Sequence, residues 1–261
     1  MTTFLSVAYL FAEGSVLGWC IELIFRRFID PDNVKKKWVN PGFLTGPYLP
    51  LYGFVLIMLY SMRRMENYLP IENTFLRKAA LFLLMALFIT IFEFETGYIF
   101  IIKLKIVLWD YTGYFGNVMA IICPLYSFYW CLLSLFYCLV LDPAVAFLIE
   151  KQKELPQMSF FLGMFYGIFL IDLAISVKNL INLSEFAWKH NILIRIDEFR
   201  EQIQNFRIGN RQKHIFFQPM RFTDTMSASL ERYREFLSKV KPKAIQQKIS
   251  DRRARKDEKE Q

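Results

Sequence analysis

Residues that commonly carry chemistry are scarce in this 261-residue sequence. It has only two histidines, His190 and His214, and its four cysteines lack the spacing of a metal site such as CxxC. No GxxxxGKS/T, GxSxG or HExxH motif is present, so the chain cannot hydrolyse ATP through a P-loop. We therefore predict no catalytic residue, no metal site and no cofactor.

Charge is also sparse, and it is unevenly distributed. Charged residues make up 21% of the sequence, against 54% hydrophobic residues, which excludes a disordered or collagen-like chain and a disulfide-stapled secreted module. Residues 1–177 contain 13 basic and 13 acidic side chains, so the net charge of +8 lies in the last third. We predict a transmembrane domain over residues 1–178 and a basic, water-facing helical tail over residues 179–261.

Long apolar stretches fill the first two thirds of the chain. A helix that crosses a bilayer needs about 20 mostly apolar residues, because the hydrocarbon core is about 30 Å thick. The first stretch has no preceding basic residue and contains Glu13 and Glu22, so we interpret it as a permanent span and not a signal peptide. The sequence predicts an all-α fold, a polytopic transmembrane helical bundle of about five spans: 4–25, 43–62, 79–102, 115–141 and 159–177.

The distribution of lysine and arginine predicts the orientation, because basic loops stay on the cytoplasmic side. The N-terminus has no basic residue, the first loop has five, and residues 178–261 have 19. With five spans, we predict an outside N-terminus and a cytoplasmic C-terminus. A re-entrant turn around Pro47 and Pro50 stays open and would change this topology. The second loop is discordant, with four basic residues: Arg63, Arg64, Arg77 and Lys78.

Carboxylates inside the predicted spans are the most informative feature for function: Glu13, Glu22, Glu93, Glu95 and Asp172. An ionised carboxylate in hydrocarbon costs about 2.5–3.5 kcal/mol on the insertion scale, so it must be paired, protonated or in contact with water. Glu22 precedes Arg26 by one helical turn and can pair with it. Glu93 and Glu95 are two residues apart and point to different faces of their helix. For Glu93, a functional cavity and structural hydrogen bonding both stay open.

Two irregular segments adjoin the spans. Residues 40–54 read NPGFLTGPYLPLYGF, and such a rigid backbone lines substrate sites in transporters, although it can also simply end a helix. Residues 109–116 read WDYTGYFG, and tryptophan and tyrosine favour the headgroup level of a membrane. Asp110 could cap the next helix or meet the arginines of the first loop.

We expect these motifs to converge on one site around Glu93, unless each motif only caps its own helix. Partners in reach would be the hydroxyls of Tyr48 and Tyr52, the indole N–H groups of Trp19 and Trp109, and an arginine such as Arg26 or Arg63. The candidates for a substrate or cavity site are Glu22, Glu93, Asp110, Tyr52, Trp109 and Trp19. The candidates for shaping the backbone are Gly42, Gly46, Pro47, Pro50, Gly53 and Gly97.

The tail has the pattern of a helical, charged region. Apolar residues at 192, 196, 199, 203 and 206 form one helical stripe, and a second helix is predicted over 225–240. Basic and acidic residues alternate, so we expect no nucleic-acid partner. A partner-binding arm, an anchor to anionic lipid and a solvated hairpin of two helices all stay open.

Five motifs occur in order along the chain: GWCIE (18–22), WVNPGFLTGPYLPLYGF (38–54), FEFETGYIF (92–100), LWDYTGYFGN (108–117) and Trp130. At these motifs, over about residues 5–145, the sequence resembles the Putative ABC-transporter type IV family, or CmpB-like permease family, of bacterial membrane proteins. The resemblance implies a multi-pass, permease-like protein of the bacterial cytoplasmic membrane. The motif positions it implies are Trp19, Glu22, Gly42, Gly46, Pro47, Pro50, Tyr52, Gly53, Glu93, Gly97, Trp109, Asp110 and Tyr111.

Three functions follow as hypotheses. The first is a permease-like subunit, embedded in the lipid bilayer, that works with a separate ATPase or another membrane subunit. The second is a sensor, scaffold or assembly protein that acts through its tail. The third is an intramembrane enzyme acting on lipid through Glu93 or Asp110, although no nucleophile is indicated. A homo-oligomer stays open in each case.

Overall fold

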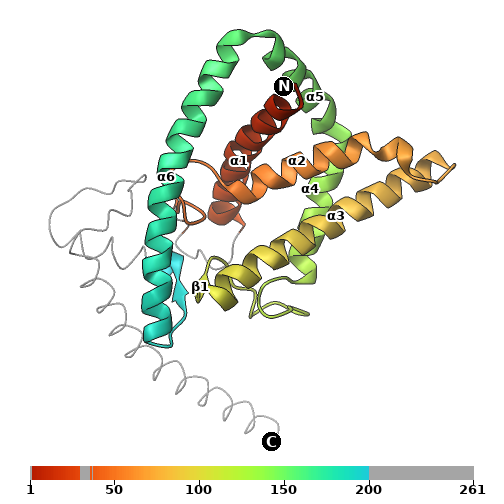
Figure 1. Cartoon of the computed structure of the whole chain (residues 1–261). Helices are drawn as coiled ribbons and strands as arrows, with labels where there is room; N and C mark the ends of the chain where they lie inside the picture. Colours follow the sequence, from red (N-terminus) through yellow and green to blue (C-terminus); the bar gives the residue numbers. More distant parts are fainter. Residues whose placement is uncertain (1, 30–35, 37, 200–261) are drawn as a thin grey trace, which may run out of the picture. The chain divides into compact units, whose positions relative to one another are not determined.

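A computed structural model describes residues 2–29, 36 and 38–199 (Figure 1). Residues up to Asp197 belong to one compact unit, and Glu198 begins a second. The helices of the first unit are α1 (Thr2–Phe28), α2 (Pro50–Arg64), α3 (Thr74–Tyr98), α4 (Pro124–Phe136), α5 (Asp142–Glu154) and α6 (Pro156–Lys189). The shorter elements are a 3₁₀ turn (Glu66–Tyr68), π turns (Ile99–Lys103 and Tyr137–Leu141), β1 (Ile106–Val107) and β2 (Ile194–Arg195).

Local sequence explains where the helices begin. Proline occupies the first position of α2, α4 and α6, where its missing N–H costs no hydrogen bond. The side chain of Asn73 caps α3 by accepting hydrogen bonds from the backbone N–H groups of Phe75 and Leu76, at 2.9 and 3.1 Å. The π turn between α4 and α5 lies just before Pro143, the second residue of α5. In a regular α-helix the proline ring would clash with the carbonyl four residues earlier, which lies in this turn.

The prediction of an all-α, polytopic membrane protein is confirmed. Within the described residues, four helical stretches are long and apolar enough to span a membrane: Phe4–Phe28, Thr74–Lys103, Pro124–Gln152 and Gln157–Lys189. Helix α2 stands in place of the second predicted span, 43–62. Its 15 residues rise about 22 Å, which is less than the hydrocarbon thickness of about 30 Å.

Contacts between helix ends show that α2 nevertheless carries the chain back along the bundle. Arg26, near the end of α1, pairs with Asp197, which follows α6. Strands β1 and β2, which follow α3 and α6, are paired in parallel. At the other end of the bundle, Arg64 of α2 pairs with Asp142 at the junction of α4 and α5. The chain thus runs back and forth between two ends.

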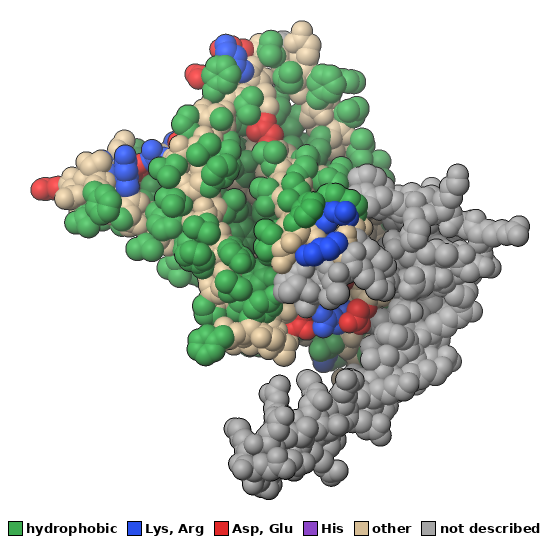
Figure 2. Space-filling view, turned by 180° about the vertical axis from the view of Figure 1, so that it is seen from behind, with side chains coloured by type: hydrophobic (Ala, Val, Ile, Leu, Met, Phe, Trp, Pro, Cys, Tyr) green, Lys and Arg blue, Asp and Glu red, His purple; other side chains and the backbone are tan. Residues whose placement is uncertain are grey.

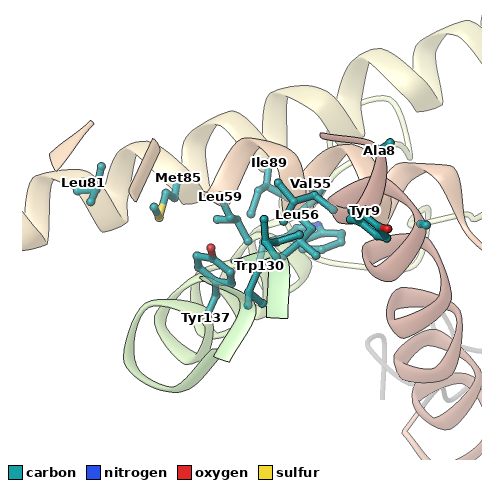
Figure 3. Packing of buried hydrophobic residues seen from close by; sticks show 14 of the residues in the cluster. Ala8, Tyr9, Val55, Leu56, Leu59, Leu81, Met85, Ile89, Trp130 and Tyr137 are labelled. Atoms are coloured by element: carbon teal, nitrogen blue, oxygen red, sulfur yellow. The ribbon is translucent and has the colours of Figure 1, made fainter. Parts of the chain in front are cut away.

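Apolar side chains line both the interior and the outer surface of this unit. The core contains buried residues from all six helices, and Figure 3 shows part of it, including Leu56, Met85, Ile89 and Trp130. Hydrophobic side chains also cover most of the helical surface in Figure 2, as is expected for helices that face lipid.

Three predicted boundaries differ from the observed helices. The fourth predicted span starts at 115, but α4 starts at Pro124, because residues 115–123 include left-handed backbone at Gly116, Met119 and Ala120. The predicted domain boundary at 178 falls within α6, which continues to Lys189. The predicted stripe from 192 is interrupted by β2 before a helical turn begins at Ile196. The second predicted tail helix lies outside the described residues.

Candidate functional site

A buried carboxylate, that of Glu93 on α3, forms the centre of the candidate site. Its side chain is only 3% exposed. The hydroxyl of Tyr111 donates a hydrogen bond to Oε1 at 3.0 Å, and the indole N–H of Trp130 donates to Oε2 at 2.8 Å. Both donors are neutral, and no ion pair reaches Glu93 from the described part of the chain.

A second carboxylate, Glu22 on α1, differs from Glu93 because it has a cation. Its Oε1 accepts from Arg26 Nε at 2.9 Å, and its Oε2 accepts from the hydroxyl of Tyr52 at 2.8 Å. Arg26 also pairs with Asp197 at 2.8 Å. Glu22 is therefore held by a charge-assisted hydrogen bond.

Tyr52 on α2 connects the two carboxylates. Its hydroxyl bonds to Glu22, and its ring centre lies 5.5 Å from that of Trp130, the donor to Glu93. Helix α1 approaches closely enough for this only because residue 18 is glycine, since a Cβ at Gly18 would overlap the Tyr52 side chain. One continuous set of contacts thus runs from Arg26 to Glu93 across α1, α2, α4 and α3.

The loop between α3 and α4 brings Tyr111 to Glu93. The indole N–H of Trp109 donates to the carbonyl of Ile121 at 2.9 Å, which holds the two sides of the loop together. A Cβ at Gly97 would overlap the Ile121 side chain, so glycine lets this loop pack onto α3. Trp109 and Gly97 therefore support the site without contacting the Glu93 carboxylate themselves.

Asp110 directly precedes Tyr111 but pairs with Arg195 of β2 and not with Glu93 or its donors. Its Oδ1 accepts from the backbone N–H and the hydroxyl of Thr112, and its Oδ2 accepts from Arg195 at 2.9 Å. Burial alone would raise the pKa of the Asp110 carboxyl. The Thr112 hydrogen bonds and the Arg195 charge together outweigh burial and hold this pKa below its usual range.

The proline-rich segment, residues 40–54, is held by Asp172, an acid that was not among the site candidates. Asp172 on α6 uses one oxygen, Oδ2, to accept from the backbone N–H groups of Thr45 and Gly46 and the hydroxyl of Tyr48, at 3.0, 2.9 and 2.7 Å. Trp19 holds the start of the segment, because its indole N–H donates to Asn40 Oδ1 at 2.6 Å. Asp172 therefore provides an acceptor for backbone N–H groups that lipid could not pair.

The backbone-shaping candidates serve this segment and the contact between α1 and α2. Gly42 adopts a φ of +75°, a left-handed conformation that favours glycine. Gly46 and Pro47 lie in the part held by Asp172, and Pro50 opens α2. A Cβ at Gly53 would lie 2.7 Å from the carbonyl oxygen of Phe11, so glycine is required there for close packing on α1.

The structure thus links Glu22, Tyr52 and Glu93. Trp109 and Asp110 lie in the loop that brings Tyr111 to Glu93, while Trp19 lies with the proline-rich segment. The expected partners of Glu93 all bond elsewhere: Tyr48 to Asp172, Tyr52 to Glu22, Trp19 to Asn40, Trp109 to the Ile121 carbonyl, Arg26 to Glu22 and Asp197, and Arg63 to Glu66 and Asp142. The actual donors, Tyr111 and Trp130, lie in the quoted motifs but were not chosen as candidates. The signal for Trp130 was available, since an indole N–H inside a span needs an acceptor.

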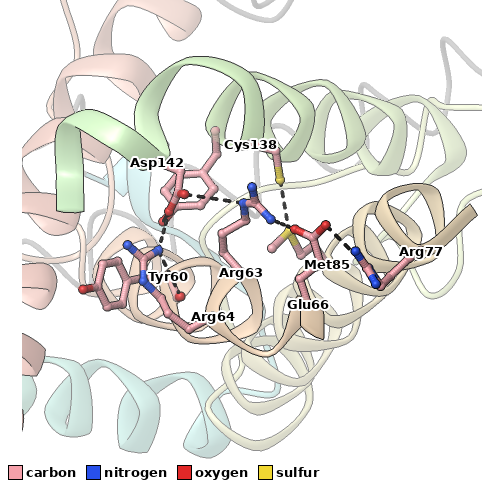
Figure 4. A network of polar contacts seen from close by, with 9 residues as sticks. Tyr60, Arg63, Arg64, Glu66, Arg77, Met85, Cys138 and Asp142 are labelled. Carbon is pink, nitrogen blue, oxygen red and sulfur yellow. Dashed lines mark hydrogen bonds and ion pairs between the residues drawn. The ribbon is translucent and has the colours of Figure 1, made fainter. Parts of the chain in front are cut away.

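Arg63 belongs to an ion-pair cluster at the opposite end of the bundle (Figure 4). It pairs with Glu66, a 7% exposed side chain on the 3₁₀ turn, and lies 3.4 Å from Asp142. Arg64 pairs with Asp142, and Arg77 approaches Glu66 at 3.9 Å. Three of the four basic residues that made the second loop discordant are therefore engaged by carboxylates.

No group of three or more potential metal ligands occurs among the described residues. No curated protein and no solved structure matches the chain. The family model described as "Putative ABC-transporter type IV" matches residues 9–177, which include Glu22, Tyr52, Glu93, Tyr111, Trp130 and Asp172. The predicted resemblance is confirmed, and the chain belongs to the Putative ABC-transporter type IV family.

Proposed function

We propose that this chain is the permease-like membrane subunit of a transporter whose ATP hydrolysis is carried out by a separate subunit. The family is described as related to ABC transporters, and four helical stretches in the described residues can span a membrane. The sequence itself contains no P-loop, so we assign ATP hydrolysis to another chain. A cell-membrane location with a cytoplasmic C-terminus is part of this proposal.

One observation carries the proposal beyond the family description. Glu93 is buried in a membrane-spanning helix and receives hydrogen bonds only from neutral donors within the described residues. A carboxylate in that setting is costly to keep without a function. Without its own cation it can exchange a proton or accept a cationic group of a substrate. Glu22, whose charge is already matched by Arg26, is suited to orient Tyr52 instead.

The test is ATP hydrolysis by the complex purified intact from its native membrane. We expect an ATP-hydrolysing subunit to co-purify and Glu93→Gln to reduce hydrolysis about tenfold or more, since hydrogen bonds to a charged group are worth about 1.5–3 kcal/mol each. Glu95→Gln is the matched control, because it makes the same change two residues away on an exposed position of α3. Membrane insertion and subunit composition should be preserved in both variants.

Two outcomes would contradict the proposal. A purified complex without an ATP-hydrolysing subunit would contradict the proposed separate ATPase. Wild-type hydrolysis in Glu93→Gln would make Glu93 a packing residue. The tail-based alternative, a sensor or scaffold, is favoured by one specific observation, namely the two ion pairs that join residues just after α6 to the transmembrane bundle.

A further inference from the structure

The segment Ile194–Asp197, which lies a few residues after α6, is joined to the membrane bundle by backbone and side-chain contacts. Ile194 is fully buried and donates its backbone N–H to the carbonyl of Lys105 at 3.0 Å. Ile194 and Arg195 form β2 and pair in parallel with β1. The indole of Trp188, at the end of α6, also donates to the carbonyl of Lys103 at 3.0 Å. The segment is therefore fixed on the loop that leads to Tyr111.

Two charged residues of this segment reach the site by separate routes. Asp197 pairs with Arg26 at 2.8 Å, and Arg26 holds Glu22, which accepts from Tyr52. Arg195 pairs with Asp110 at 2.9 Å, and Asp110 directly precedes Tyr111, the donor to Glu93. The first route therefore ends at Glu22 and the second at Glu93.

We propose that the segment Ile194–Asp197 positions the intramembrane site, with Asp197 acting on Glu22 through Arg26 and Arg195 acting on Glu93 through Asp110 and Tyr111. Both are positioning residues, since neither touches Glu93. The basic tail continues directly from this segment, so a partner or lipid surface that binds the tail would act on the site through these ion pairs. The expected effect on transport rests on the proposed function, whereas the structural test below does not depend on it.

The structural test uses the purified full-length chain and the indole N–H resonance of Trp130, which reports on its hydrogen bond to Glu93. The chain has five tryptophans, and loss of one resonance in Trp130→Phe identifies the right one. Glu93→Gln then defines the shift expected when this hydrogen bond is weakened. We expect Arg195→Gln and Asp197→Asn each to move the resonance in that direction.

Conservative and neighbouring variants separate positioning from general destabilisation. Arg195→Lys and Asp197→Glu keep the charge, so the Trp130 resonance should stay near its wild-type position. This is expected because each pair uses a single N–H donor. Lys189→Gln and Glu185→Gln make the same charge changes at exposed positions of α6 and should leave it in place. In the intact complex, Arg195→Gln and Asp197→Asn should lower ATP hydrolysis about two- to fivefold, the scale of a partly exposed ion pair.

The inference is overturned if both neutral variants leave the Trp130 resonance at its wild-type position, or if the controls move it equally. Two variants on two separate ion pairs keep the test decisive when one of them assembles poorly. Suppose that Glu93→Gln leaves hydrolysis unchanged while Arg195→Gln still shifts the resonance. The proposed function then fails, and the positioning role of the segment stands.

Discussion

Glu22 and Glu93 are both membrane-embedded carboxylates, but their partners assign them different roles. Glu22 has a cationic partner within the chain, Arg26, which also pairs with Asp197. Glu93 has one neutral donor on each oxygen, which fixes its orientation without neutralising its charge. Orientation by neutral donors leaves the proton or a cation free to come and go, whereas an arginine partner opposes such exchange.

Asp110 makes stability depend on pH in the acidic range. Its pKa is lowered in the folded state below the ordinary value of about 3.9. Its contribution to the free energy of unfolding is therefore complete above that value and is lost as the pH falls through the lower folded pKa. We expect the unfolding temperature in detergent to fall below about pH 4, and to fall less steeply in Asp110→Asn. Equal slopes in the two proteins would show that Asp110 contributes nothing.

At the scale of elements, the contact between α1 and α2 depends on small residues. Gly14 and Gly18 of α1 face Gly53 and Tyr52 of α2, and a Cβ at either glycine of α1 would lie too close to α2. Association of helices in a membrane relies on close packing, because lipid supplies no hydrophobic driving force between them. The same closeness lets Tyr52 reach Glu22.

Gly18→Ala should therefore push α1 and α2 apart and weaken the Tyr52–Glu22 hydrogen bond. We expect a destabilisation of about 1–3 kcal/mol, the usual cost of overpacking, seen as a lower unfolding temperature in detergent. Gly167→Ala in α6 is the control, because a Cβ there meets no atom within 4 Å. A Gly18→Ala protein as stable as this control would show that α1 and α2 can separate without cost.

The proline-rich segment keeps its shape because Asp172 on a distant helix accepts three hydrogen bonds from it. Asp172→Asn removes the charge from this acceptor, and hydrogen bonds to a charged group are worth about 1.5–3 kcal/mol each. We expect the segment to loosen, so that a cysteine placed at Leu44, which is 1% exposed, reacts faster with a thiol reagent. Ser176→Ala removes a single donor from the other oxygen of Asp172 and should have a smaller effect. The reverse order of reactivity would contradict this assignment.

At the scale of the whole molecule, the prediction of orientation rests on basic residues at the two ends of the bundle. Arg63, Arg64 and Arg77 opposed the predicted orientation in the sequence, but Glu66 and Asp142 engage them. An arginine held by a carboxylate interacts less with anionic headgroups than a free one. The end that contains residues 65–73 is therefore compatible with the outside of the membrane.

Thiol labelling in intact cells tests this orientation. In a chain without its native cysteines, we expect an impermeant reagent to label Tyr68→Cys, on the turn between α2 and α3, without permeabilisation. Phe115→Cys, in the loop between α3 and α4, should react only after permeabilisation. Tyr68 and Phe115 are 83% and 97% exposed, so access by the reagent is not limited by burial. Labelling of Phe115→Cys alone would contradict this orientation. Labelling of both would show that α3, which lies between the two positions, does not cross the membrane.

Sequence alone could predict the helical membrane fold and the family, and it could single out Glu22 and Glu93 as carboxylates that need partners, because apolar runs and intramembrane charge are local properties of the chain. It could not predict helix starts inside apolar runs, as at Pro124, since the turn before it is set by left-handed residues that also carry apolar side chains. The hydrogen-bond partners of the side chains were even harder to predict. Tyr48, Tyr52 and Tyr111 are chemically equivalent in sequence, yet they bond to three different carboxylates.

What the sequence by itself determined is that this chain must lie in a membrane, because its apolar runs are too long and its charges too few for a water-soluble core. It also determined that several carboxylates needed partners there. Only the tertiary structure decided which partners they obtained. Arg26 and Asp197 are 171 positions apart, and Asp172 is 127 positions from Thr45. Such pairs form through the packing of helices whose order along the chain leaves their neighbours in space undetermined.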